Sequence, residues 1–140
     1  MSRRKKVVSR PPVVGFGSLS FEESRYVRGG KTWLASTLYR ACLDQELEPF
    51  EFPLACYDLS NRYFALENTD DFVWQMRRTL DADYERYPVI LDEFGQVCDG
   101  NHRICHALLD GRESVMAYRL QSMPKPDFVD EGDNNGTNNK

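Results

Sequence analysis

The polar residues whose types and spacing could do chemistry are concentrated in one short stretch, Asp99-Gly100-Asn101-His102-Arg103. A β-prone run ends just before this stretch and an amphipathic run follows it, so the stretch is predicted to lie where a strand becomes a helix. Backbone amides at a helix N-terminus are unpaired and attract anions, and a glycine allows close approach to the backbone. The sequence therefore predicts a phosphate pocket at residues 100–103.

Within this pocket the side chains are predicted to have different roles. Arg103 can hold two oxygens in a fork, and His102 supplies a second side-chain donor beside it. Asp99 and His102 are the candidate catalytic residues, with Asp99 orienting the phosphates or a magnesium ion. The plainer alternatives are that Asp99 only accepts backbone amides in a turn, and that His102 and Arg103 only solvate the start of a helix.

Cys98, His102 and His106 are potential zinc ligands, because they are close in sequence and the two histidines are one helical turn apart. Cys98 belongs to a predicted strand, so we expect no metal site formed by these residues. The four cysteines include no CxxC pair, and Cys42 and Cys105 fall on or near apolar faces, which favours reduced thiols in a core.

The elements that must position the stretch are predicted on both sides of it. Residues 88–91 form a compact β-prone run, residues 92–95 a turn and residues 96–98 a short partner strand. The helix that follows has Ile104, Ala107 and Leu108 on one face, and Gly111 is placed to end it in the left-handed conformation. A last strand is predicted from Ser114 to Leu120.

Two further helices and an edge strand are predicted upstream. Apolar spacing from Trp33 to Gln45 predicts an amphipathic helix, and residues 50–54 alternate as a short edge strand. Residues 57–64 are predicted to be a connector. Asn68 or Thr69 is predicted to cap a second helix, which extends to Leu80. The apolar face of this helix, which is expected to pack on the core, consists of Phe72, Val73, Met76 and Leu80.

Length and composition predict one α+β domain with a small mixed sheet and packed helices. The chain has 140 residues and 41% hydrophobic residues, enough for a single core. We expect a flexible basic arm at residues 1–12, one domain at 13–122 and a disordered acidic, Asn-rich tail at 123–140, with a short strand at Val13-Val14 and otherwise irregular structure to Gly30. No apolar stretch is long enough to span a bilayer, so we expect a cytoplasmic protein without membrane partners.

The region around the polar stretch resembles the ParB/sulfiredoxin superfamily. The resemblance rests on PVILDEFGQVCDGNHR at residues 88–103 and ALLDG at 107–111, and the core motif spans residues 87–120. It implies an α+β domain that binds a nucleotide, ATP or CTP as tri- or diphosphate, at the turn before the helix. ParB proteins have Gly-Glu-Arg-Arg where this chain has residues 100–103. Sulfiredoxins have Gly-Gly-Cys-His-Arg, so Asn101 replaces their catalytic cysteine and sulfinic-acid reduction is not expected.

Members of this superfamily use the pocket for different reactions, so the resemblance indicates a site more than a reaction. We expect a nucleotide-phosphate-binding domain that acts as a nucleotide hydrolase or phosphotransferase with Mg²⁺. Two alternatives stay open: a non-catalytic regulator of a phage or mobile element that binds DNA or a host protein, and a metal-dependent nuclease. Acidic residues serve the kinase and nuclease relatives, and the nearest here are Asp92, Glu93 and Asp99. The sequence leaves the oligomeric state open, with a homodimer as one option.

Overall fold

The structure, a computed structural model, describes residues 24–130. The helices in this range are α1 Ala35–Asp44, α2 Thr69–Asp81 and α3 Asn101–Leu109, with a short 3-10 turn, η2, at Leu54–Cys56. The strands are β1 Arg25–Arg28, β2 Lys31–Leu34, β3 Phe50–Pro53, β4 Val89–Leu91, β5 Val97–Asp99, β6 Ser114–Arg119 and β7 Phe128–Val129. This mixture of helices and sheets confirms the predicted α+β class. The predicted basic arm and the strand at Val13-Val14 lie outside the described residues.

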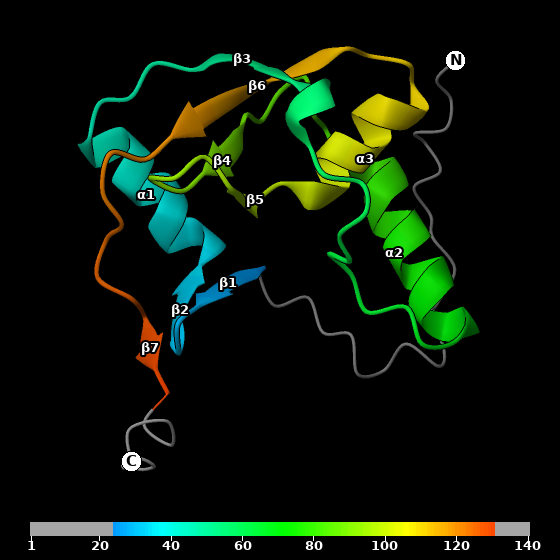
Figure 1. Ribbon diagram of the computed structural model, residues 1–140, viewed down its shortest axis with the longest axis horizontal. Coiled ribbons are helices and arrows are strands. Elements are labelled where there is room, and N and C mark those ends of the chain that lie inside the picture. The colour runs from blue at the N-terminus through cyan, green and yellow to red at the C-terminus, as the bar shows by residue number, and fades with distance from the viewer. Residues whose placement is uncertain (1–23, 131–140) are drawn as a thin grey trace.

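The main sheet has four strands in the order β3-β6-β4-β5 (Figure 1). β4 is parallel to β6 and antiparallel to β5, while β6 is antiparallel to β3. β3 lies at one edge, as predicted from Pro53, because an edge strand tolerates a missing amide donor. The strands predicted at residues 88–91, 96–98 and 114–120 are therefore confirmed.

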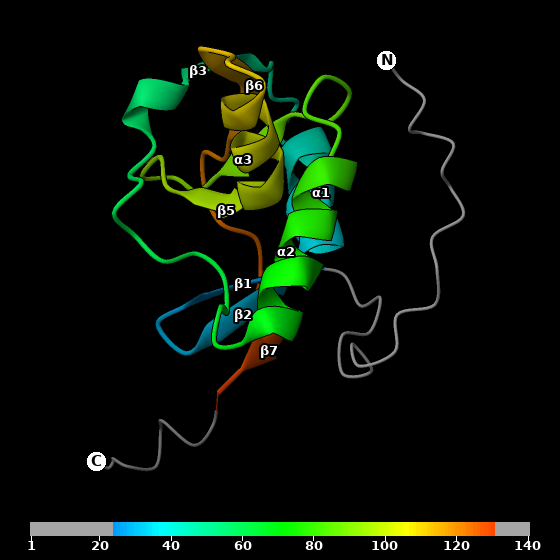
Figure 2. The same cartoon turned by 90° about the vertical axis from the view of Figure 1, so that its right-hand side faces the viewer.

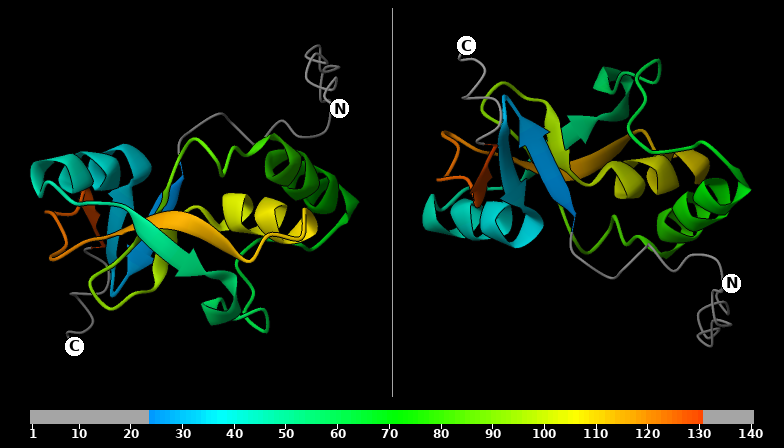
Figure 3. Two further views of the ribbon diagram at one scale, coloured as in Figure 1. Left: turned by 90° about the horizontal axis from the view of Figure 1, so that it is seen from above. Right: turned by 90° about the horizontal axis from the view of Figure 1, so that it is seen from below.

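The main sheet is covered on both faces, which explains why all three residues of β4 are buried. Val89 and Leu91 pack with α3, whereas Ile90 points to the other face and packs with α1. Figure 3 shows α1 in cyan at one end of the molecule and α2 with α3 at the other, with the sheet between them. A strand enclosed in this way needs a continuous apolar run rather than an alternating one.

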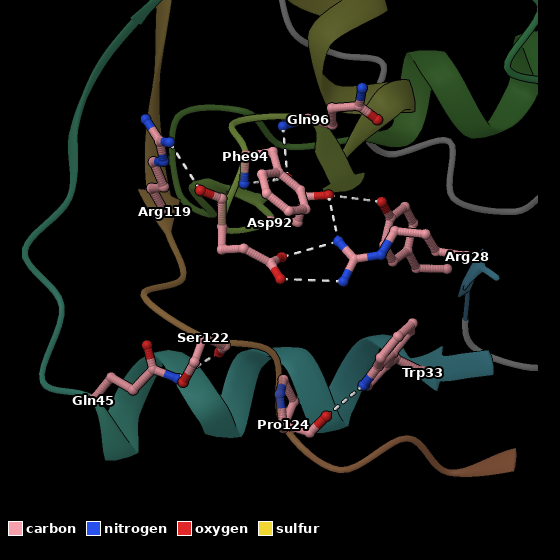
Figure 4. Close-up of polar contacts among 11 residues, drawn as sticks. Arg28, Trp33, Gln45, Asp92, Phe94, Gln96, Arg119, Ser122 and Pro124 are labelled. Atoms are coloured by element: carbon pink, nitrogen blue, oxygen red, sulfur yellow. Dashed lines mark hydrogen bonds and ion pairs between the residues drawn. The ribbon is translucent and has the colours of Figure 1, made fainter. Parts of the chain in front are cut away.

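A second small sheet joins the two ends of the described chain. β1 and β2 form a hairpin, and β7 pairs with the other edge of β2. This hairpin corrects two expectations, because residues 25–28 were predicted as irregular and Trp33 as helical. Trp33 lies in β2, where its indole Nε1 donates to the carbonyl of Pro124 at 2.7 Å (Figure 4).

The chain after β6 also belongs to the fold, which differs from the boundary expected at residue 122. Residues 128–129 form β7, and Asp127 accepts hydrogen bonds from the backbone amide of Leu34 at 2.8 Å and from the Thr37 hydroxyl at 2.9 Å. These contacts were not predictable from composition, because Asp, Pro and Lys dominate this segment. Residues 131–140 lie outside the described range.

α2 forms where the sequence predicts it, but it packs on the core with a different face from the one expected. Asn68 caps the helix by accepting from the amide of Asp71 at 2.9 Å, as expected. The buried residues are Trp74 and Thr79. The four residues expected to face the core are exposed instead: Phe72, Val73, Met76 and Leu80. Figure 2 shows that α2 lies beside α3 at the surface of the molecule, and among the described elements α3 is the main neighbour of α2.

α3 lies next to β4 and ends as predicted. Ile104 and Ala107 are fully buried against the sheet, and Gly111 takes a φ of 79° after the last turn. The amides of Gly111 and Arg112 donate to carbonyls in the last turn of α3, which closes the helix. Within residues 24–130, no helix has both the length and the apolar character to cross a membrane.

Candidate functional site

Gly100 sets the start of α3 directly behind the end of β5. Its φ is 121°, a conformation that residues with a side chain rarely adopt. A Cβ atom at this position would lie 2.6 Å from Cγ1 of Val89 and 3.1 Å from a terminal guanidinium nitrogen of Arg103. The glycine is therefore required twice, for its backbone angle and for close packing against β4.

α3 differs from the other two described helices in how its N-terminus is satisfied. No side chain caps it, and its first turn contains no acidic residue. Asn68 caps α2, and the Asp127 carboxylate lies at the start of α1. The amides at the start of α3 thus have no side-chain cap among the described residues, and the carboxylate of Asp99, which precedes Gly100, pairs with the Arg103 guanidinium.

Arg103 is held in place by Asp99, one turn earlier. Its guanidinium donates to Oδ2 of Asp99 at 2.7 Å, and both side chains are 18% exposed. Among the described residues, Arg103 Nε is a buried side-chain nitrogen without a hydrogen-bond partner. A buried donor without a partner destabilises a protein by about 1–3 kcal/mol. A ligand oxygen that accepts from this nitrogen would remove that penalty and so gain binding free energy.

His102 is a neutral imidazole at physiological pH. Burial, together with the positive charges of Arg78 and Arg103, lowers its pKa to about 4. Its Nε2 lies 2.6 Å from Oε1 of Gln75 on α2, so Nε2 carries the proton when that oxygen accepts. The ring of Phe64 packs against the imidazole, with 4.5 Å between ring centroids.

Asn101 is oriented by a buried tyrosine. The Tyr57 hydroxyl donates to Oδ1 of Asn101 at 2.7 Å, and the Tyr57 ring stacks on Tyr63 with 4.8 Å between centroids. Burial raises the pKa of Tyr57 far above its ordinary value, so the phenol stays protonated and remains a donor. Because Oδ1 is bound to Tyr57, the amide nitrogen of Asn101 is the end left to serve as a donor.

The structure does not bring the three predicted acidic candidates together. Asp92 is completely buried, and its carboxylate accepts from Tyr26, Arg28 and the amides of residues 94 and 96 (Figure 4). Glu93 pairs with the same guanidinium of Arg28 at 2.9 Å. These bonds lower the pKa of Asp92 although burial opposes ionisation. Asp92 and Glu93 thus fasten the β1–β2 hairpin to the β4–β5 turn, while Asp99 pairs with Arg103.

The three residues considered as zinc ligands, Cys98, His102 and His106, lie in other environments. Nδ1 of His106 lies 2.8 Å from the carbonyl of Ala82, and His102 contacts Gln75. Cys98 is buried, which raises the pKa of its thiol well above the ordinary value. In the part of the chain that the structure describes, no three His, Cys, Asp or Glu side chains form a group that could hold a metal.

Sequence reasoning missed the residues that support the site from outside the motif. Gln75, Phe64 and Tyr57 come from α2 and the connector before it, and no local pattern marks them. Arg78 also comes from α2, and its positive charge contributes to the lowered pKa of His102. Only the register between α2 and α3 reveals these contacts.

Comparisons with family models, with curated proteins and with solved structures gave no match for this chain. Function is therefore inferred from the geometry of the site and from the sequence resemblance at residues 88–103.

Proposed function

We propose that the start of α3 binds the phosphate groups of a nucleotide, with Gly100, Asn101, His102 and Arg103 as the contact residues. The observation that carries the proposal is the helix start itself, which has no side-chain cap and no acidic residue in its first turn. The positive charges of Arg78 and Arg103 both lower the pKa of His102, which lies in this helix start. An uncapped helix N-terminus with guanidinium groups nearby is a favourable environment for phosphate.

The contact residues bind the phosphates through different interactions. Backbone amides at the start of α3 donate to phosphate oxygens, and the fixed Arg103 supplies charge close to them. Asn101, oriented by Tyr57, adds a neutral donor. His102 acts as an uncharged group, because its pKa is about 4. Binding therefore depends on Arg103 and the helix start more than on an imidazolium.

A nucleotide is preferred over inorganic phosphate for two reasons. The motif at residues 88–103 resembles a nucleotide-binding superfamily, and aromatic side chains lie beside the helix start. The half-buried ring of Phe64 contacts His102 directly. Aromatic rings next to a phosphate pocket offer a stacking surface for a base.

Hydrolysis or phosphate transfer would use Asp99 as the acidic residue of the site. Mg²⁺ commonly binds proteins through one or two carboxylates and otherwise through water and the nucleotide phosphates. Asp99 fits that need with a single carboxylate, of which Oδ2 already accepts from Arg103. In this account Asp99 orients Arg103 in the free protein and would hold Mg²⁺ when a nucleotide carries the ion in.

The proposal is tested by a thermal-shift panel of ATP, ADP, CTP, GTP and inorganic phosphate, each with and without Mg²⁺. A ligand at about 100 times its Kd adds about 2.7 kcal/mol, which raises Tm by several degrees in a domain of this size. We expect one nucleotide to raise the Tm of the wild type and to have little effect on Arg103→Gln. Arg40→Gln, at an exposed position of α1, is the matched control and should keep the full shift.

Each variant is compared with its own Tm without ligand, because Arg103→Gln also leaves Asp99 without its partner. The double variant Asp99→Asn, Arg103→Gln removes both charges and should lose binding equally. The proposal fails if no nucleotide stabilises the wild type. Binding of duplex DNA by that same protein would then favour the regulator, and nicking of plasmid DNA with Mg²⁺ or Mn²⁺ would favour the nuclease.

A further inference from the structure

α2 carries an apolar surface that the described fold does not cover. Phe72 and Leu80 are 53% and 56% exposed, and Val73 and Met76 lie between them on the same side of the helix. Of the buried residues of α2, Trp74 lies on the opposite side of the helix, and Thr79 lies at the border of the exposed set. We refer to the exposed set, Phe72, Val73, Met76 and Leu80, as the α2 stripe.

The α2 stripe is continuous, which separates it from scattered surface apolar residues. Phe72, Met76 and Leu80 follow one another at intervals of four residues, so they form a single ridge, and Val73 widens it. Isolated exposed apolar residues need no explanation, but a contiguous ridge is typical of an interaction surface. The ridge has the form that packs against another helix.

Charges beside the α2 stripe are arranged so that a second copy of the same helix would complement it. Asp70 lies in the first turn and Arg77 seven residues later. Seven residues are about 20° short of two full turns, so both side chains lie on the same flank of the helix. An antiparallel copy, related by a two-fold axis, places the same flanks together and brings opposite ends of the helices face to face.

We propose that a second copy of this chain packs its α2 antiparallel onto the α2 stripe. With the two-fold axis near the middle of the helix, Val73 contacts Met76 of the partner subunit. Asp70 then lies within reach of Arg77 of the partner subunit, and the contact occurs twice by symmetry. The opposed helix dipoles favour the same arrangement.

The size of the stripe sets the strength of this contact. One helix from each subunit buries less than the roughly 1,200–2,000 Å² of a stable interface, so the dimer belongs to the weak class. We therefore expect a reversible monomer–dimer equilibrium in the micromolar range rather than an obligate dimer. The contact is independent of the proposed nucleotide site, which lies at the start of α3.

Sedimentation velocity of the full chain, at protein concentrations from about 5 to 500 µM, tests the proposal. The wild type should shift from monomer to dimer across this range. Met76→Lys, at an exposed position, should keep the fold and weaken association at least tenfold. The single reversals Asp70→Arg and Arg77→Asp should each weaken it at least threefold, and the double reversal should restore it.

A loss of helix stability alone cannot produce that pattern. Each reversal places a charge unfavourably with respect to the helix dipole, so on that explanation the double variant would associate most weakly. Arg40→Asp, on α1 at the other end of the molecule, is the matched control and should leave association unchanged (Figure 3). The proposal is overturned if the wild type stays monomeric at 500 µM, or if Met76→Lys associates as the wild type does.

Discussion

The starts of α2 and α3 meet the same physical requirement in different ways. α2 begins with Asn68 as its cap and has Asp70 and Asp71 in its first turn, so the chain supplies its own negative charge. α3 begins at Gly100, without a side-chain cap and without a first-turn acid. Unpaired amides at a helix start cost stability unless a partner satisfies them. Among the described residues, α3 therefore has no side-chain cap of its own, which leaves its start for the phosphate ligand that we propose.

α1 shows that this protein can satisfy a helix start from a distant segment. Leu34, which precedes the helix, has no capping side chain, yet Asp127 accepts from its amide and from Thr37 in the first turn. A carboxylate more than ninety residues away in sequence thus occupies the α1 start. No side chain of the described residues caps α3 in this way, which is the basis for the ligand proposed there.

The largest expected effect comes from forcing a side chain into the start of α3. Gly100→Ala would combine an unfavourable φ of 121° with a 2.6 Å approach to Val89, and we expect a loss of about 3–5 kcal/mol in the free energy of unfolding. Urea denaturation measures the loss. Gly111→Ala is the control, because its φ is 79° with open space around it, and it should cost only about 1–2 kcal/mol. Equal costs would contradict the packing role of Gly100.

The second effect is a pH dependence of the free energy of unfolding that arises from His102 at the start of α3. The pKa of His102 is 6.5 in an unfolded chain and about 4 in the fold. Between these values the unfolded chain binds more protons, so this contribution to stability is complete above about pH 6.5 and is lost as the pH falls toward 4. After allowance for partial exposure, we expect a loss of about 2 kcal/mol.

Denaturation of wild type and His102→Gln at pH 7 and pH 4.5 measures this contribution, because carboxylates titrate equally in both proteins. The variant should lose less stability on acidification. A pH dependence identical in wild type and His102→Gln would contradict the neutral state assigned to His102.

Smaller effects are expected where the chain supplies its own cap. Asn68→Ala and Asp127→Ala each remove a hydrogen-bond acceptor from a helix start and should cost about 1 kcal/mol in unfolding free energy. Neither change should alter a nucleotide-induced shift in Tm, because neither cap belongs to α3. A change in nucleotide affinity in either variant would remove the distinction between the helix starts.

The predictable part of the fold was the part encoded by local pattern. The strand at residues 88–91, the turn, the short strand and the helix ended by Gly111 all follow from neighbouring residues, and the structure confirms them. The cap at Asn68 was predictable for the same reason. These features depend on residues within about one turn of each other, so periodicity and turn chemistry are sufficient.

Features that depend on long-range contact could not be predicted. Trp33 was expected in a helix because its spacing fits one, but pairing with β1 and β7 places it in a strand. The apolar periodicity of α2 indicated a helix correctly but not which face would be buried. In the candidate site, residues 99–103 were predicted from the sequence, whereas Gln75 and Tyr57 reach the site only through tertiary packing.

The most direct test of the central claim gives α3 the negative charge that α2 already has. Asn101→Asp keeps the oxygen that accepts from Tyr57 and places a carboxylate in the first turn of α3. Favourable interaction with the helix dipole should stabilise the fold by about 0.3–1 kcal/mol. Asn68→Asp, which keeps the cap of α2, is the matched control.

Isothermal titration of the wild type and both variants with ATP, CTP and inorganic phosphate, each with Mg²⁺, is the deciding measurement. We predict that the wild type and Asn68→Asp bind the same nucleotide, and that Asn101→Asp binds it at least tenfold more weakly. No binding by the wild type, or equal affinity in Asn101→Asp, would contradict a phosphate site at the start of α3.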